Sequence, residues 1–178
     1  MNEDQTMPEI VPIFSKQEIA DRVKALAQQI SADYADKELI IIGVLKGCFI
    51  FLSDLVRQLN ISVKIDFIRL ASYGSGTVSS GAIKITKDIE LDLQGKDVLI
   101  VEDIIDSGKT LSFLLDHLKS FGPKSVKICS FIDKTERREI SIPIDYKGFK
   151  VKAGFLVGYG LDFDERYRTM PEVCCIKP

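Results

Sequence analysis

The chain has 178 residues, which fits one domain over residues 1–178 with a core that needs no metal or disulfide. Its formal net charge of −2 gives no general attraction to nucleic acid or to a membrane surface, so any anion-binding site must be local. The longest aliphatic run, residues 39–45, is too short to span a membrane, and the first residues resemble no secretory signal. We therefore expect a cytoplasmic protein.

The first elements in the chain are a loose end and an amphipathic helix. Residues 1–12 are polar and proline-punctuated, which is typical of a loose terminus leading to a short extended piece. The run Ser15-Lys16-Gln17-Glu18 has the form of a capping box, so a helix should begin there. Its expected apolar stripe comprises Ile19, Val23, Leu26 and Ile30.

A strand, a loop and a second helix follow. The continuous apolar run over residues 39–45 is typical of a strand buried on both faces, and an apolar helix should cover about residues 49–59. Between them lie Lys46 and Gly47, which can offer a charge and an amide to a polyanion. On the residues alone, an ordinary surface loop is the better interpretation of this pair.

A predicted strand over residues 63–70 is followed by a segment of small polar residues. Residues 72–81 are rich in glycine and serine and cannot support a packed core. Composition alone leaves two interpretations open, a mobile lid or a simple hairpin linker. Residues 83–86 would form the second arm of that hairpin.

The stretch from Val98 to Thr110 is where we expect the chemistry to be assembled. Four branched apolar residues, Val98 to Val101, predict a buried strand, and Glu102 and Asp103 follow at its end. The loop Asp106-Ser107-Gly108-Lys109-Thr110 then leads into a helix, whose first amides and positive dipole end offer a seat for a phosphate group. Glu102 and Asp103 lie one short turn from that phosphate site, where a bound ribose 5-phosphate would present its 2- and 3-hydroxyls. Phosphate and diol together indicate a ribosyl phosphate.

Two other interpretations of this stretch stay open on the residues alone. The triplet Gly108-Lys109-Thr110 also occurs in the phosphate loop of nucleotide triphosphatases, but that motif requires a glycine where this chain has Asp103. An acid-ended strand in another doubly wound domain, such as a phosphoacceptor receiver, has the same pattern.

The rest of the chain sets the fold class. Gly122-Pro123 should end the helix near Phe121, and residues 126–132 predict another strand. Repeated strand and helix units indicate an α/β fold with a doubly wound, mainly parallel sheet flanked by helices and a site at the carboxyl ends of the strands. Residues 142–178 are less regular and should not simply extend the sheet.

We interpret the cysteines as reduced thiols, His117 as structural, and Arg137 and Arg138 as solvated.

The string from Val98 to Leu111 resembles the phosphoribosyl pyrophosphate motif of the hypoxanthine-guanine phosphoribosyltransferase family. Further matches extend the resemblance from about Ile13 to Ile176. It implies a type I phosphoribosyltransferase fold with a hood formed by the terminal segments, including about residues 142–178. It also implies an enzyme of purine salvage that transfers the phosphoribosyl group to N9 of hypoxanthine or guanine. Mg²⁺ would be the cofactor, and a homodimer or homotetramer the assembly.

The resemblance also implies the roles of individual residues. Asp106 would move the proton at N7, and Lys134 would donate to the 6-oxo group of a purine stacked on Phe155, with the Leu156 and Val157 backbone near the edge of the base. The metal would be held by Glu102, Asp103 and Asp162, the last also close to the purine. Phosphoribosyl pyrophosphate would contact Lys46, Gly47, Ser72, Tyr73, Glu102, Asp103, Asp106, Ser107, Gly108, Lys109, Thr110 and Arg168.

Departures from the family pattern are small. Ser107 stands where some relatives have threonine, and the segment 72–81 has no acid in its middle. Relatives can have a cis peptide before the lysine of the Leu45-Lys46-Gly47 loop. An alternative function is a non-catalytic regulator of purine genes on the same fold. Such regulators add a DNA-binding segment, whereas only one helix precedes the first buried strand here.

Overall fold

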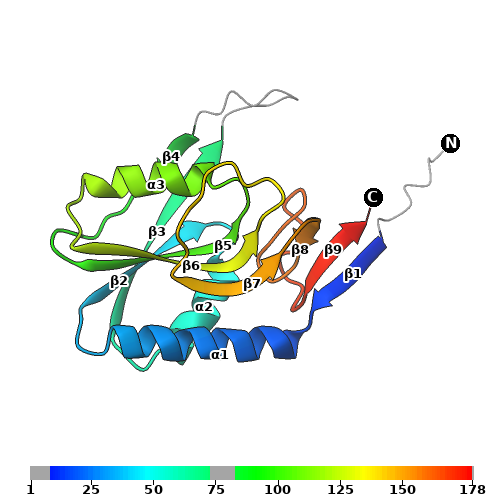
Figure 1. Cartoon of the computed structure of the whole chain (residues 1–178), viewed down its shortest axis with the longest axis horizontal. Helices are drawn as coiled ribbons and strands as arrows, with labels where there is room; N and C mark the ends of the chain where they lie inside the picture. The colour runs from blue at the N-terminus through cyan, green and yellow to red at the C-terminus, as the bar shows by residue number, and fades with distance from the viewer. Residues whose placement is uncertain (1–8, 73–82, 178) are drawn as a thin grey trace.

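The computed structural model describes residues 9–72 and 83–177, which form a large sheet flanked by helices and a smaller sheet at one end (Figure 1). The elements in chain order are β1 (Glu9–Phe14), α1 (Lys16–Asp33), β2 (Leu39–Leu45), α2 (Phe49–Gln58), β3 (Val63–Ser72), β4 (Ile83–Lys87), β5 (Asp97–Ile105), α3 (Lys109–Lys119), β6 (Ser125–Lys134), β7 (Tyr146–Val151), β8 (Phe155–Val157) and β9 (Val173–Lys177).

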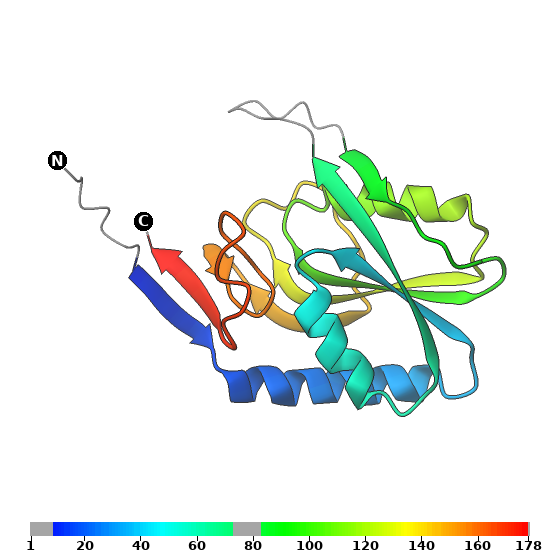
Figure 2. The ribbon, with the colours of Figure 1, turned by 180° about the vertical axis from the view of Figure 1, so that it is seen from behind.

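The large sheet has six strands in the order β4-β3-β2-β5-β6-β7. All neighbouring pairs are parallel except β3 and β4, which form the antiparallel hairpin expected after residue 70. Helices α1 and α2 cover one face and α3 covers the other, as the two opposite views show (Figures 1 and 2). The predicted doubly wound, mainly parallel fold is confirmed.

The apolar residues of the central strands divide between two cores because successive side chains on a strand point to opposite faces. Ile41 and Leu99 pack with the helices α1 and α2 in one cluster. Ile40 and Val98 pack in the other, together with the apolar side of α3, which comprises Leu111, Leu114 and Leu118. Both central strands therefore need the unbroken apolar runs seen in the sequence.

The capping box at the start of α1 is present. The Ser15 amide donates to Glu18 Oε2 at 2.8 Å, and the Glu18 amide donates to Ser15 Oγ at 3.3 Å. The predicted apolar stripe is buried, at Ile19, Val23, Leu26 and Ile30. This long helix fixes the position of β1, which directly precedes it, relative to the large sheet.

The smaller sheet has the antiparallel order β1-β9-β8 and joins the two ends of the described chain. Its position at one end of the large sheet fits the predicted hood (Figure 2). The loose terminus predicted through residue 12 is wrong for residues 9–12, because β1 pairs with β9 from Glu9↔Lys177 onward. The expectation that residues 142–178 do not simply extend the sheet is wrong for β7, which lies at the edge of the large sheet, parallel to β6.

No helix within residues 9–72 and 83–177 is long and apolar enough to cross a membrane.

Candidate active site

The loops that follow β2 and β5 meet because these strands are parallel neighbours, with Leu39 opposite Asp97. The peptide between Leu45 and Lys46 is cis, as it can be in relatives, although the sequence alone did not decide this. Gly47 lies directly against the Asp103 side chain, so closely that a Cβ atom at position 47 would overlap the carboxylate. Two predicted site segments are thereby brought into contact, although Gly47 and Asp103 lie 56 residues apart in the sequence.

Glu102 and Asp103 form an acidic pair within the last four residues of β5, which continues to Ile105 and so extends past the predicted strand end at Val101. Burial, together with the neighbouring Asp103 carboxylate, raises the pKa of Glu102 well above its ordinary value. Burial also raises the pKa of Asp103. Glu102 Oε2 is buried and has no hydrogen-bond partner among the described residues. A buried carboxylate oxygen of this kind is stabilised by a hydroxyl donor or a cation, so the pair is suited to a diol or a metal ion.

The loop after β5 forms the predicted seat for a phosphate group. The N-cap of α3 is Gly108, which has a φ of 86° and no side chain to cap the helix, and the first turn contains no acidic residue. The amides of that turn are therefore available to an anion, apart from the Lys109 amide, which donates to Ser107 Oγ at 3.3 Å. Beside them lies a cavity of about 140 Å³, lined by Glu102, Ile104, Ile105, Asp106, Ser107, Gly108, Thr110 and Leu111. The other loop residue, Lys109, is exposed and its ammonium pairs with Glu139 at 2.6 Å.

Asp106 and Lys134 lie together at the edge of this cavity. The Lys134 ammonium is 3.4 Å from Asp106 Oδ2 and 3.7 Å from Glu136 Oε2, although the lysine side chain is only 8% exposed. Asp106 Oδ1 is buried and has no hydrogen-bond partner among the described residues. The two predicted base-reading residues, from the ends of β5 and β6, thus present an ammonium donor beside a free carboxylate oxygen. The N-cap of α3 is Gly108, so Asp106 does not serve to cap this helix.

Arg138 is a site residue that the sequence analysis missed. It was interpreted as solvated, but its guanidinium is 18% exposed and donates to the carbonyl oxygens of Ile105, Asp106 and Lys134 at 2.8 to 2.9 Å. It also pairs with Asp133 Oδ1 at 2.6 Å. Arg138 therefore joins the ends of β5 and β6 and positions both Asp106 and Lys134. A rigid fork of donors can satisfy several carbonyls at once, which a solvated side chain would not do.

The segment that follows Arg138 supports the phosphate loop directly. The amides of Glu139 and Ile140 both donate to the Ser107 carbonyl at 3.0 Å. Gly108 packs against the Ile140 carbonyl so closely that a side chain at position 108 would overlap it. The geometry of the phosphate seat thus depends on a segment about 30 residues further along the chain.

We expect Arg138→Ala to lower the free energy of unfolding by about 3 kcal/mol, because it leaves three carbonyls and the buried Asp133 carboxylate without their main donor. Urea denaturation of the purified variant measures this. The control is Arg137→Ala, which removes the same charge from an exposed position. Equal stability of the two variants would show that Arg138 does not hold the loop.

A cluster of charges lies near Gly47, because Gly160 packs against the Gly47 carbonyl and accepts from Arg168. Arg168 donates to the Gly160 carbonyl at 2.8 Å and pairs with Asp162 Oδ1 at 2.9 Å and Glu165 Oε2 at 3.1 Å. The Lys46 ammonium pairs with Glu165 Oε1 at 2.7 Å. The two cations predicted to contact pyrophosphate are therefore close together, and both contact Glu165, which the sequence analysis did not single out.

The predicted wall for the purine lies on the hood. Phe155 is the first residue of β8 and its side chain is 48% exposed, as is that of Phe163, against which it packs edge-on at 5.3 Å between ring centroids. Leu156 and Val157 continue the strand and are buried. An exposed aromatic ring held by a second ring can stack on a base. Ser72 ends β3, whereas Tyr73 and the predicted lid after it lie outside the described residues.

The three acids predicted to bind the metal are not all assembled in one place. Within residues 9–72 and 83–177, no group of three or more His, Cys, Asp or Glu side chains has the geometry to hold a metal ion. Asp162 is instead paired with Arg168. Glu102 and Asp103 remain suited to Mg²⁺, which keeps several waters and substrate oxygens as ligands and needs only one or two protein carboxylates.

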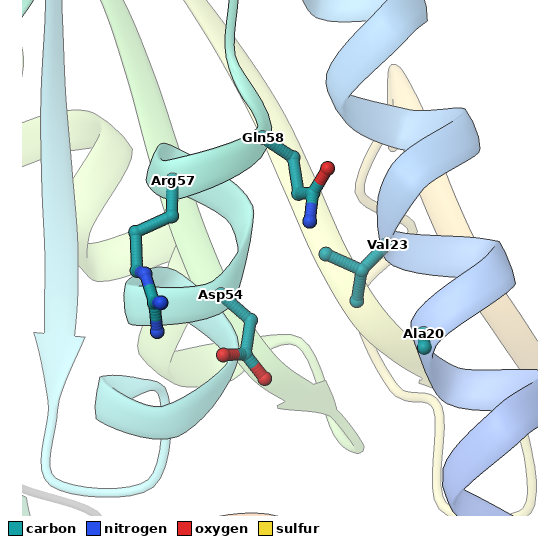
Figure 3. A pocket seen from close by; sticks show the side chains of 5 residues that line it. All are labelled: Ala20, Val23, Asp54, Arg57 and Gln58. Atoms are coloured by element: carbon teal, nitrogen blue, oxygen red, sulfur yellow. The ribbon is translucent and has the colours of Figure 1, made fainter.

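A separate cleft of about 270 Å³ lies between α1 and α2 (Figure 3). Its lining residues are Ala20, Val23, Asp54, Arg57 and Gln58. None of them belongs to the predicted site, and the cleft is shaped by the packing of the two helices that cover one face of the sheet.

Comparisons with known proteins identify the family of the chain. The profile of the phosphoribosyl transferase domain family matches residues 12–164. The chain is 45% identical over 166 residues to the hypoxanthine-guanine phosphoribosyltransferase of Aquifex aeolicus, covering 93% of both proteins. It is 44% identical to the bifunctional protein TilS/HprT of Listeria innocua, of which it spans 26%.

Among solved structures, that of a hypoxanthine-guanine phosphoribosyltransferase from Bacillus anthracis superposes with a TM-score of 0.89 at 42% identity, covering 96% of this chain and 100% of that one. A hypoxanthine phosphoribosyltransferase from Staphylococcus aureus superposes with the same TM-score at 38% identity, covering 94% and 91% of the two chains. With this coverage and identity, the chain belongs to the phosphoribosyl transferase family.

Proposed function

We propose that this protein is a 6-oxopurine phosphoribosyltransferase of purine salvage. It would transfer the 5-phosphoribosyl group of phosphoribosyl pyrophosphate to N9 of hypoxanthine or guanine, giving IMP or GMP and pyrophosphate. The observation that carries the proposal is the Lys134 ammonium 3.4 Å from the Asp106 carboxylate, at the edge of a cavity lined by the phosphate loop. The names of the relatives from Aquifex aeolicus and Bacillus anthracis support the same reaction.

The ribosyl phosphate would bind along the end of β5. The helix amides that follow Lys109 and the hydroxyls of Ser107 and Thr110 suit the 5-phosphate. Glu102 and Asp103 suit the ribose diol, because the unpartnered Glu102 Oε2 can accept from a hydroxyl. Pyrophosphate would then lie toward Lys46, Gly47 and Arg168, on the side where the two cations gather.

The purine base would be recognised by one hydrogen-bond donor, Lys134, and one acceptor, Asp106. Lys134 would donate to the 6-oxo oxygen, and Asp106 would accept the proton at N7. As that proton leaves, electron density rises at N9, which forms the bond to the anomeric carbon while the bond to pyrophosphate breaks. Adenine carries an amino group at position 6, so it would place a donor against the Lys134 donor and bind poorly.

Bound Mg²⁺ would neutralise the polyphosphate and stabilise the growing negative charge of the leaving group. Its ligands from this chain would be Glu102 and Asp103, with Asp162 a ligand only after it releases Arg168. The hood ring of Phe155 would hold the base against the site, and the segment over residues 72–81 would exclude water from the reacting carbon.

The proposal is tested by an assay of nucleotide formation from phosphoribosyl pyrophosphate with hypoxanthine, guanine, xanthine or adenine. We expect product from hypoxanthine or guanine, at least about 100-fold less from adenine, and no product in the presence of EDTA until Mg²⁺ is restored. Turnover with adenine at a similar rate would refute the role of Lys134. Binding of phosphoribosyl pyrophosphate without turnover of any base would favour the regulator instead.

Assembly as a homodimer or homotetramer remains a prediction that rests on the family resemblance, and residence in the cytoplasm remains a prediction that rests on the sequence. Sedimentation at several protein concentrations tests the first of them.

A further inference from the structure

Glu165 lies between Lys46 and Arg168, the two cations that are proposed to bind pyrophosphate. Its Oε1 atom is 2.7 Å from the Lys46 ammonium, and its Oε2 atom is 3.1 Å from the Arg168 guanidinium. One carboxylate thus joins a loop at the end of β2 to a loop in the hood, 119 residues later in the chain. Glu165 has no role in the steps of the proposed reaction.

The loop around Glu165 has a defined conformation that places the carboxylate there. The Glu165 amide donates to Asp162 Oδ2 at 2.9 Å, and Phe163 and Arg166 exchange two backbone hydrogen bonds. Asp164 and Glu165 both have positive φ angles, 51° and 61°, which non-glycine residues rarely adopt. Such conformations persist where surrounding contacts enforce them.

The carboxylate is nevertheless easy to displace. The Glu165 side chain is 62% exposed, and that of Lys46 is 44% exposed, so both can turn into water when a stronger anion arrives. Hydrogen bonds from Lys46 and Arg168 hold the pKa of Glu165 below its ordinary value, so the group is ionised at neutral pH. Arg168 also keeps a second carboxylate partner in Asp162 at 2.9 Å.

We propose that Glu165 is an internal competitor for the pyrophosphate subsite, which neutralises Lys46 and Arg168 in the free enzyme and is displaced by the pyrophosphate group of the substrate or product. The inference rests on the proposed function, because it assumes that these two cations bind pyrophosphate. The two ion pairs that Glu165 forms, with Lys46 and with Arg168, must be broken before pyrophosphate binds both cations. Glu165 therefore weakens the binding of product pyrophosphate and speeds its release.

The experiment measures the affinity of inorganic pyrophosphate, with Mg²⁺ present, by isothermal titration calorimetry. We expect Glu165→Gln to bind pyrophosphate about threefold to tenfold tighter than the unmodified protein, the range given by removing two exposed ion pairs. The difference should shrink at 0.5 M NaCl, where exposed charges are largely screened. The Ki of pyrophosphate as a product inhibitor should fall by the same factor.

Asp164→Asn is the matched control. It removes one negative charge from the adjacent exposed residue, which also has a positive φ that asparagine tolerates. We expect its affinity for pyrophosphate to change by less than about twofold. If Glu165→Gln binds pyrophosphate no tighter than the unmodified protein, or if Asp164→Asn gains as much, the inference is wrong.

Lys46→Ala separates this inference from the proposed function. If the subsite exists, this variant loses affinity for pyrophosphate whatever Glu165 does. If pyrophosphate does not bind to the unmodified protein, or binds equally well to Lys46→Ala and all other variants, the proposed subsite is wrong and the inference is wrong with it.

Discussion

Asp106→Asn should lower kcat by about 10² to 10⁴ while the affinity for phosphoribosyl pyrophosphate changes by less than about threefold. Asparagine has the same shape as aspartate but cannot accept the N7 proton. The phosphate seat does not depend on the Asp106 side chain, because the loop is held through backbone carbonyls by Arg138 and by the amides of residues 139 and 140. The variant should therefore fold and bind but not turn over.

Single-turnover kinetics and calorimetric titration with phosphoribosyl pyrophosphate check the two halves of this prediction. Asp116→Asn is a suitable control, since it removes a carboxylate from the exposed side of α3, where Asp116 pairs with Lys119. If Asp106→Asn keeps full turnover, proton transfer at N7 belongs to another group. If it loses substrate affinity as strongly as turnover, Asp106 acts in binding rather than in catalysis.

The centre of the site was predictable because its signals are local in sequence. The apolar run of β5, the acids Glu102 and Asp103, and the small residues of the phosphate loop are contiguous, and together they indicate a strand, a turn and the start of a helix. The parallel sheet then brings the loop after β2 to the same edge, as the strand and helix units predict.

Arg138 could not be found in this way. Its partners Ile105 and Asp106 lie 33 and 32 residues earlier, and its neighbours in sequence are charged residues typical of a solvated loop. The contact of Glu165 with Lys46 could not be found either, because the two residues lie 119 positions apart in the sequence. Both contacts are formed by the tertiary fold, and a single sequence carries no local signal for them.

The two errors in the fold have comparable causes. β1 is a short edge strand that pairs with β9, so its order depends on a segment far along the chain. β7 was obscured by Gly148, which usually weakens a strand. Here glycine is needed because β7 lies so close to β6 that a Cβ atom at position 148 would overlap the Phe131 carbonyl. The close approach of the two backbones explains why a glycine stands inside this strand, where it made the strand hard to predict.

Gly47→Ala should reduce kcat/KM by at least about 100-fold with little loss of overall stability. The Gly47 backbone is outside the left-handed region, so alanine brings no conformational strain of its own, but its methyl group would overlap the Asp103 carboxylate. The loop cannot retreat freely, because Gly160 packs against the Gly47 carbonyl on the other side. Asp103 must move instead, and displacing a positioning group by about 1 Å is enough to cost this factor.

Gly95→Ala is the control for Gly47→Ala, because it adds the same methyl group and should lower stability without lowering turnover. Gly95 has a φ of 68° and open space around its Cβ position, so alanine there is strained but meets no neighbour. We expect this variant to lose about 1 kcal/mol of unfolding free energy and to keep full turnover. Steady-state kinetics and urea denaturation of both variants therefore distinguish the two effects. If Gly47→Ala retained normal kcat/KM, the contact between this loop and Asp103 would have no part in the reaction, and the β2 loop would serve only to close the sheet.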